Sequence, residues 1–365
     1  METSLNATRA LESKRSRLPL IDALRAIAST MIALHHFALY PPLSTNAQPL
    51  YGVLIDWVCV HGRAAQVFFV ISGFILAQSL AHRRWPMQAA RRYLVHRYCR
   101  LGLPYLAAIA VALVAWAFAR QAISADWVDP APTWGHMLAH LFFLQDILGY
   151  GSISAGLWFV CINIQLSLLF VGGLIVRDAI AGRADGRLRA TLAHLPMLGG
   201  WLLAATSLFY FNLDDQRWDM WAVYFFGQFF LGVVVHASLQ SPRSGCWLAL
   251  YASLMVAALV YDYRGRVLTT LLTGLAIFVG ARHGFMATWP RSRVLGFMGR
   301  TSYSLFLIHY PVMIVVAAVW AMLGWTTPGQ ALSGLFVSYF ASIVAAAVFF
   351  KIVEAPATKL SNLFR

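Results

Sequence analysis

Long apolar segments recur along this chain from Leu20 to Lys351, and they restrict its fold more than any other feature. Each runs for about 18 residues or more with few charges, which is enough for a helix to cross about 30 Å of hydrocarbon. Charged residues make up only 12% of the chain, against about 25% in soluble domains. The hydrocarbon core offers no water to hydrogen-bond the backbone, so every backbone N–H and C=O group of a span needs a partner within the protein. The sequence therefore predicts an all-α, polytopic membrane helix bundle.

The sequence predicts ten membrane-spanning helices. They cover residues 20–40, 64–82, 101–119, 155–176, 193–211, 219–238, 246–262, 267–282, 301–323 and 331–351. Residues 41–63, with Asp56, are expected to form an outer loop. The segment His136–Ile147 is apolar but too short to span, so it is placed at the outer interface or as a re-entrant stretch. Residues 1–19 are then a cytoplasmic basic leader, 20–353 one membrane domain and 354–365 a cytoplasmic tail.

The charge distribution predicts the orientation of the bundle. Most of the 28 Lys and Arg residues fall in alternate connections, which the positive-inside rule places in the cytoplasm together with both termini. The outer connections carry mostly aspartates, including Asp214, Asp215 and Asp262. The net charge of +14 is therefore explained by topology and does not indicate nucleic-acid binding. The four cysteines are scattered and form no CxxC pair, so no metal site is predicted.

The first predicted span, LRAIASTMIALHHFALY, carries ionisable side chains inside an apolar helix. Arg25 and His36 are eleven residues apart, so they share one helix face about 16 Å apart along the axis. Arg25 has Asp22 as its expected ion-pair partner, or it extends to the membrane surface. His36 lies deep and has two interpretations: a general base, since imidazole has a pKa near 6.5, or a neutral ring bonded to another helix. His35 points about 100° away.

A basic cluster precedes the third span. Arg91, Arg92, Arg97 and Arg100 lie in RRYLVHRYCRLGLPYL, with Arg97 and Arg100 one helical turn apart. Such a cluster can anchor the protein to anionic membrane lipids. It can also bind phosphates, since guanidinium groups contact phosphate oxygens in pairs. The second interpretation predicts a nucleotide-bearing donor at this surface.

Two further spans carry polar residues. In QVFFVISGFILA, Ser72 and Gly73 are small, which favours close helix packing. In SYSLFLIHYPV, Tyr303 and His309 lie about 240° apart around the helix and so face different ways. His309 by itself is as compatible with a structural role as with a functional one.

Taken in order, these motifs resemble acyltransferase family 3, the integral-membrane acyltransferases of bacterial surface and secreted glycans. The similarity runs from about Leu18 to the C-terminus. The matching features are Arg25 and His36, FFVISGF at 68–74, Arg97 with Arg100, Pro104 and Tyr105, SYSLFLIHYPV at 302–312, and Val353-Glu354-Ala355-Pro356.

The resemblance implies a bundle of about ten helices in the bacterial inner membrane. It would move an acyl group, acetyl in the first instance, from cytosolic acyl-CoA to a hydroxyl of an extracytoplasmic polysaccharide or lipid-linked glycan. Arg25 and His36 would be the principal pair, Arg97 and Arg100 would lie on the donor side, and Tyr303 and His309 would support the site. No bound cofactor is implied beyond the donor substrate.

The chain departs from the family pattern at two places. In LWFVCINIQ, Asn163 stands where many members have an acid, and Gln165 follows it. Gln66 likewise replaces an acid before FFVISGF. Any mechanism in which a carboxylate at these places orients the histidine is therefore in doubt, and Asn163, Gln165 and Ser72 enter as supporting residues only.

Two other classes of function remain open from the sequence. A transporter or flippase for a lipid-linked glycan would also use basic inner loops and an intramembrane histidine. A purely structural membrane partner would tolerate changes at His36. Only the enzyme would consume acyl-CoA and release free CoA.

Overall fold

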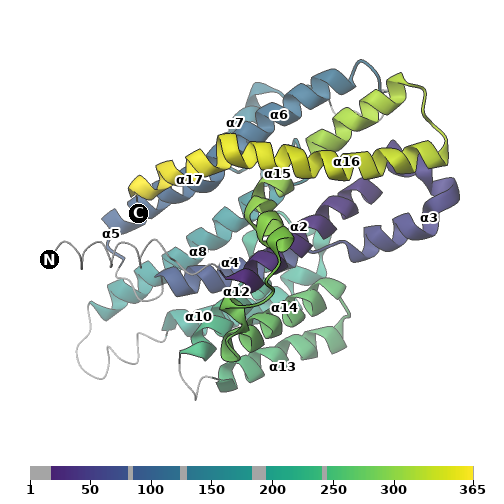
Figure 1. Cartoon of the computed structure of the whole chain (residues 1–365). Helices are drawn as coiled ribbons and strands as arrows, with labels where there is room; N and C mark the ends of the chain where they lie inside the picture. Colours follow the sequence, from purple (N-terminus) through teal and green to yellow (C-terminus); the bar gives the residue numbers. More distant parts are fainter. Residues whose placement is uncertain (1–17, 81–84, 124–129, 183–194, 241–244, 365) are drawn as a thin grey trace, which may run out of the picture.

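The computed structural model describes residues 18–80, 85–123, 130–182, 195–240 and 245–364, and within these ranges every regular element is a helix (Figure 1). No strand occurs in the described ranges, so the prediction of an all-α fold is confirmed.

Each of the ten predicted segments is helical. They correspond to α2 (Pro19–Leu39), α4 (Ala65–Leu80), α6 (Leu103–Ala119), α8 (Leu157–Ala181), α10 (Leu195–Phe209), α12 (Ala222–Leu239), α13 (Gly245–Tyr261), α14 (Gly265–Arg282), α15 (Arg293–Met322) and α16 (Pro328–Phe349). The remaining helices are α3 (Leu43–His61), α5 (Met87–Arg97), α7 (Trp134–Leu141), α11 (Asp215–Trp218) and α17 (Ala355–Ser361).

Seven helical stretches are long and apolar enough to cross a membrane, which indicates a multi-pass membrane protein. They are Leu43–Leu80, Met87–Ala119, Leu157–Ile180, Ala222–Leu239, Gly265–Arg282, Arg293–Met322 and Pro328–Phe364. Helix α2 is not among them, and it carries an aspartate, an arginine and two histidines. The count of ten crossings and the side on which the termini lie stay predictions.

Residues 41–63 are not a loop, contrary to the sequence-based expectation. They form α3, whose axis is disturbed near Pro49, where Tyr51 has non-helical dihedral angles. The exposed side chains Val53, Trp57 and Val60 follow a helical spacing. The polar residues and Pro49 interrupt the apolar run of this stretch, so apolar length alone does not indicate a helix there.

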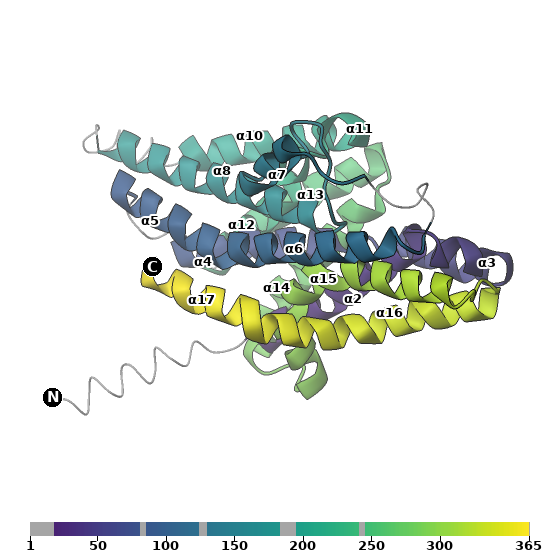
Figure 2. The ribbon, with the colours of Figure 1, turned by 90° about the horizontal axis from the view of Figure 1, so that it is seen from above.

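Two long rods run side by side at one flank of the bundle (Figure 2). In the first, α5 continues into α6 through the π-helical turn η1 (Tyr98–Gly102). In the second, α16 continues into α17 through the π-helical turn η6 (Phe350–Glu354). The boundary expected between residues 353 and 354 therefore falls inside a continuous helical rod. Single π turns of this kind often lie at functional sites.

Helix α2 lies at the junction of two apolar cores. Ile21 and Ile32 belong to the core formed with α4, α8, α10, α12, α13 and α14. Phe37 belongs to the second core, formed with α6, α15 and α16. The one helix that carries Arg25 and His36 is thereby packed between both halves of the molecule.

Helices α4 and α12 approach each other backbone to backbone. A Cβ atom on Gly73 would meet the carbonyl oxygen of Phe229, and one on Gly232 would meet that of Val70. The prediction that the small residues of α4 serve close packing is confirmed for Gly73. Small residues let helix backbones approach in this way in membrane proteins.

The segment after α7 packs against α6 and α8 through buried polar groups. The backbone N–H of Ile153 donates to Nε2 of His140 at 3.3 Å, so Nδ1–H of His140 donates to the Tyr105 hydroxyl at 2.6 Å. Tyr105 in turn donates to Oε1 of Gln145 at 3.3 Å. Burial lowers the pKa of His140 to about 3, which keeps this ring neutral. Only α7 itself, eight residues long, is helical here, which is too short to span a membrane.

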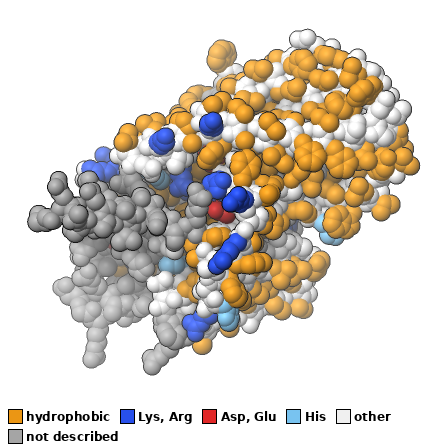
Figure 3. Space-filling view, viewed as in Figure 1, with side chains coloured by type: hydrophobic (Ala, Val, Ile, Leu, Met, Phe, Trp, Pro, Cys, Tyr) orange, Lys and Arg blue, Asp and Glu red, His pale blue; other side chains and the backbone are white. Residues whose placement is uncertain are grey.

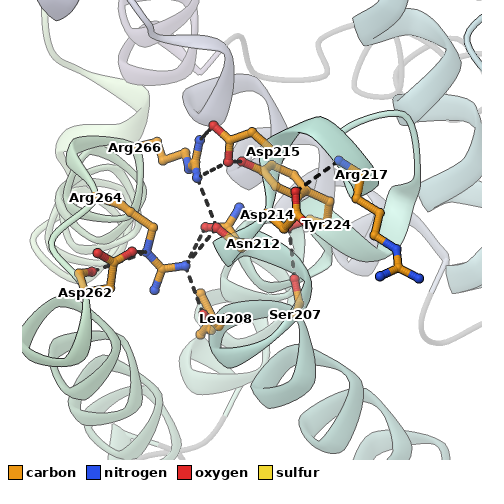
Figure 4. Close-up of polar contacts among 10 residues, drawn as sticks. All are labelled: Ser207, Leu208, Asn212, Asp214, Asp215, Arg217, Tyr224, Asp262, Arg264 and Arg266. Atoms are coloured by element: carbon orange, nitrogen blue, oxygen red, sulfur yellow. Dashed lines mark hydrogen bonds and ion pairs between the residues drawn. The ribbon is translucent and has the colours of Figure 1, made fainter.

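The charges expected in the outer connections gather into one network (Figure 4). Arg266 donates to both carboxylate oxygens of Asp215 at 2.6 and 2.8 Å, and the Tyr224 hydroxyl donates to the same carboxylate at 2.6 Å. Arg264 is buried and donates to the carbonyls of Leu208 and Asn212. These contacts join the ends of α10, α12 and α14 and serve as a structural clamp.

The clamp predicts a dependence of stability on pH. The Arg266 guanidinium holds the pKa of the Asp215 carboxyl below its usual value. The ionised Asp215 carboxylate therefore stabilises the folded protein fully above the usual aspartate pKa. This stabilisation is lost as the pH falls through the lowered pKa of Asp215 in the folded protein. Because Asp215 is half exposed, Asp215→Asn should cost about 0.2–1 kcal/mol at neutral pH.

Thermal unfolding of the detergent-solubilised protein between neutral and acidic pH measures this effect. The difference between wild type and Asp215→Asn should shrink toward acid. A difference that stays constant with pH would contradict the assignment.

Candidate functional site

A cavity of about 330 Å³ opens between α2, α4, η1, α8, α15 and η6. We call it the arginine cavity, because Arg25, Arg97, Arg100 and Arg300 line it. Asp22 and Glu354 are its acidic residues, so its described wall carries a net positive charge. On the described surface in Figure 3, Lys and Arg gather on the half that carries the C-terminus, and hydrophobic side chains cover the opposite end. The cavity therefore suits an anionic ligand.

Arg97 is held in the cavity wall by Asn163. The guanidinium NH2 group donates to the amide oxygen of Asn163, whose amide nitrogen donates to the Ser72 hydroxyl at 2.7 Å. Within the described chain, the buried Nε–H of Arg97 has no hydrogen-bond partner. A buried donor without a partner is uncommon in proteins, and an anion in the cavity would satisfy it. Because Asn163 is neutral, it orients Arg97 without cancelling its charge.

Two further side chains fix the shape of the cavity where the π-helical turns meet. The Ser304 hydroxyl donates to Oε2 of Glu354 at 2.5 Å, which ties η6 to α15. The Tyr303 hydroxyl donates to the carbonyl of Leu101 at 2.8 Å, which ties η1 to the same helix. Gly299 lets α15 approach the backbone of α2 at Asp22. Asp22 and Glu354 are also the carboxylates that act electrostatically on Arg25.

His36 is paired with His309 across the helix interface. Nδ1 of His36 lies 2.7 Å from Nε2 of His309, and the two rings stack with their centroids 5.0 Å apart. His309 is completely buried, whereas His36 keeps 7% of its surface exposed. Both rings of this histidine pair are therefore buried, and His36 keeps slightly more exposed surface than His309.

The backbone of α15 sets the tautomers of the pair. Nδ1 of His309 lies 3.0 Å from the carbonyl of Leu305, and a carbonyl only accepts hydrogen bonds. Nδ1 of His309 therefore carries the hydrogen, and in a neutral ring its Nε2 accepts. Two neutral rings then satisfy the 2.7 Å contact in one way, with Nδ1–H of His36 as the donor. This arrangement leaves the lone pair of His36 on Nε2.

Three phenylalanines line the arginine cavity, and one of them lies next to the histidine pair. Phe68, Phe159 and Phe306 all line the cavity, and their ring centroids lie 5.1 to 5.9 Å apart in edge contacts. Phe306 also lies 6.3 Å from the ring of His309. Neither histidine is among the described residues that line the cavity. We call these three side chains the phenylalanine cluster.

A second cavity, of about 450 Å³, adjoins the first and shares Ile75, Leu76, Arg97 and Arg100 with it. We call it the aromatic cavity, because Trp85, Tyr93 and Phe364 line it. Arg92 also lies in its wall. Arg91 is exposed and is not among the described residues lining either cavity.

The structure separates the sequence-predicted residues into groups. It brings Arg25, Ser72, Arg97, Arg100, Asn163 and Tyr303 into the arginine cavity, and it joins His36 to His309. Gln165 lies elsewhere in the fold. Its side chain accepts from the N–H of Ala222 at 2.9 Å and donates to the carbonyl of Met220 at 3.3 Å, so it caps the start of α12.

The two remaining polar residues of the sequence analysis also lie outside the cavity. His35 contacts the carbonyl of Cys59 at 2.7 Å and faces α3. Gln66 is buried in α4, and its side-chain oxygen has no hydrogen-bond partner among the described residues. In the described ranges, no group of three or more His, Cys, Asp or Glu side chains is placed to hold a metal ion.

Sequence reasoning missed Arg300, the phenylalanine cluster and the role of Glu354 in the wall. Glu354 appeared only as part of a terminal motif, although it is the one acidic residue of the last apolar helical stretch. That isolation inside an apolar stretch was the available signal. Phe68, Phe159 and Phe306 lie in motifs that were recognised, but nothing singled them out, because phenylalanine is common in apolar helices.

One of three comparisons with known proteins found a match. A family model described as an acyltransferase domain, that of acyltransferase family 3, matches residues 18–350 and thus nearly the whole chain. No curated protein and no solved structure matched the chain. The matched range contains Arg25, His36, Arg97 and His309. The family model covers far more than half of the sequence, and the chain therefore belongs to acyltransferase family 3.

Proposed function

We propose that this membrane acyltransferase moves an acyl group, acetyl in the simplest case, from acyl-CoA to a hydroxyl of a glycan. The donor enters from the cytosol at the arginine cavity, and the acceptor enters from the far side of a bacterial inner membrane. The observation that carries the proposal is the histidine pair. Its geometry gives His36 a free lone pair on Nε2 in a buried position beyond a positively charged cavity.

The arginine cavity supports the choice of donor. Acyl-CoA carries phosphates at one end and a thin thioester arm at the other, and the wall of the cavity contains both four arginines and three phenylalanine rings. Guanidinium groups bind phosphates in pairs of hydrogen bonds. The distance of about 16 Å between Arg25 and His36 along α2 suits an extended arm.

The phenylalanine cluster is the barrier that this arm must pass. We place it on the way from the arginine cavity to the histidine pair, because its rings line the cavity and Phe306 lies next to His309. Aromatic rings can rotate aside for a thin apolar chain, whereas they exclude water and ions in its absence. A closed barrier of this kind keeps the membrane sealed while the donor site is empty and keeps water from the thioester during transfer.

The chemical step needs one base and one acid, and His36 can supply both. Nε2 of His36 removes the proton of the glycan hydroxyl, and the oxygen attacks the thioester carbonyl carbon. The carbon–sulfur bond then breaks, and the CoA sulfur takes the proton back from Nε2. During this exchange His309 holds the ring through Nδ1–H and stabilises the imidazolium, as a hydrogen-bond acceptor does in catalytic triads.

Substitutions of His36 and His309 test the assignment. His36→Ala should lower acyl transfer by roughly 10²–10⁴-fold, since a general base contributes about this much. His309→Leu should lower it by roughly tenfold or more because Nδ1–H of His36 loses its acceptor. His309→Gln should recover part of the loss, since the amide oxygen can accept the same hydrogen bond.

The measurement is release of CoA by the purified protein with glycan acceptor, alongside the O-acetyl content of the host's surface polysaccharide. His35→Ala is the matched control, because its ring faces α3 and should leave the rate close to that of wild type. Full activity in well-folded His36→Ala would reject the base assignment. Glycan export without CoA release would indicate a flippase instead.

Donor affinity should depend on the arginines that line the cavity. The double variant Arg97→Gln with Arg100→Gln removes two charged donors and should weaken acetyl-CoA binding by roughly tenfold or more. Arg91→Gln removes an arginine of the same basic cluster that lines neither cavity. Isothermal titration in nanodiscs should show that this control binds as wild type does, and equal losses in both variants would point to a general surface-charge effect.

A further inference from the structure

The aromatic cavity has a composition unlike that of the arginine cavity. Its wall contains the rings of Trp85, Tyr93, His96 and Phe364. Trp85 and Tyr93 meet edge to face at 5.6 Å, and Tyr93 and His96 stack at 6.5 Å between centroids. Trp85 is fixed from both ends, since its indole N–H donates to Leu80 and its backbone N–H donates to Asp178. The cavity thus presents flat surfaces on a firmly held support.

Neutral hydrogen-bonding groups lie between these rings. The amides of Gln88 and Asn362 line the cavity, and each offers both a donor and an acceptor. The hydroxyl oxygen of Tyr93 is buried and has no hydrogen-bond partner among the residues the structure describes. A buried hydroxyl in that state is a position where a ligand atom is expected. No carboxylate is found among the described lining residues, whereas Arg92, Arg97 and Arg100 are, so the described wall is positively charged.

The end of the chain forms one side of the cavity. Asn362 and Phe364 belong to the short turn η7 (Asn362–Phe364), which packs against α5. The sequence placed these residues in a tail without a role. Their side chains instead line the aromatic cavity together with Tyr93 and His96 of α5.

We propose that the aromatic cavity binds the purine nucleotide end of the acyl donor, with the base between the rings and the phosphates at the shared arginines. The inference rests on the proposed function, which it extends by giving the donor two adjoining subsites. Arg97 and Arg100 line both cavities, so they lie where a linking diphosphate would pass from one to the other. The volume of about 450 Å³ falls in the range of about 300–1,000 Å³ usual for small-ligand sites.

A nucleotide uses more of this wall than a phospholipid headgroup would. A headgroup phosphate requires only the arginines, whereas a base also stacks on the rings and bonds to the amides through its edge. Stacking of a base on an aromatic side chain contributes enough that alanine substitution commonly weakens binding by about tenfold. The observations therefore favour the nucleotide, and lipid binding is an outcome that the test separates.

The test uses adenosine 3′,5′-bisphosphate and inorganic pyrophosphate as probes, titrated into the full-length protein in nanodiscs. Asn362→Ala with Phe364→Ala should weaken the bisphosphate by about tenfold or more and leave pyrophosphate affinity unchanged. Leu363→Ala is the matched control, because Leu363 lies between them, is 77% exposed and is not among the lining residues. Gln88→Ala removes an amide of α5 from the wall, and it should likewise weaken binding of the bisphosphate without changing the affinity for pyrophosphate.

Three results would overturn the proposal. Equal bisphosphate affinity in all variants would contradict the assignment of a base-binding site to this cavity. An equal loss for bisphosphate and pyrophosphate would show a phosphate effect only. Loss of bisphosphate binding when the nanodiscs contain phosphatidylglycerol would show competition by the lipid and would assign the cavity to a lipid.

The outcome is separable from that of the proposed function. If the bisphosphate binds as expected but acetyl-CoA gives no transfer, the base site stands and the reaction is wrong. If CoA is released from acetyl-CoA with acceptor while the Phe364 variant binds normally, the reaction stands and the base site is wrong.

Discussion

The structure depends on how the buried ionisable side chains of one helix find polar partners inside an apolar bundle. Helix α2 carries Arg25 and His36, and a polar group in hydrocarbon without a partner costs several kcal/mol. The fold provides different partners for these two side chains. Arg25 borders a cavity with acidic residues at its edge, and His36 meets His309 on α15. Placing α2 between the two apolar cores makes both contacts possible.

The proposed mechanism divides the transfer reaction along the axis of α2. In it, phosphates bind in the arginine cavity and the acyl group reacts at the histidine pair, so the two events occur in separate environments. The two π-helical turns lie at the donor end, where they place Arg100 and Glu354 in the cavity wall. Neutral Asn163 replaces an acid in this wall. The amide keeps Arg97 oriented while leaving its positive charge available to a ligand.

Continuous apolar runs predicted the ten main helices, and local sequence patterns predicted several features of the candidate site. The spacing of Arg25 and His36, the close approach at Gly73 and the basic cluster before α6 all follow from residues near one another in the sequence. The pairing of His36 with His309 does not, because the two residues are 273 positions apart and no local pattern links them. The helix α3 was missed for another reason, since its polar residues and Pro49 interrupt the apolar run. The helical packing of Asn362 and Phe364 onto α5 likewise depends on tertiary contacts.

The central claim is that His309 fixes the tautomer of His36 and thereby leaves Nε2 free to act as the base. Nitrogen-15 NMR of the histidine side chains, with the signals of His36 assigned by their loss in His36→Gln, measures this directly at neutral pH. The account predicts a neutral His36 ring protonated at Nδ1, and a change of that state in His309→Leu. A ring protonated at Nε2, or one indifferent to His309, would contradict it.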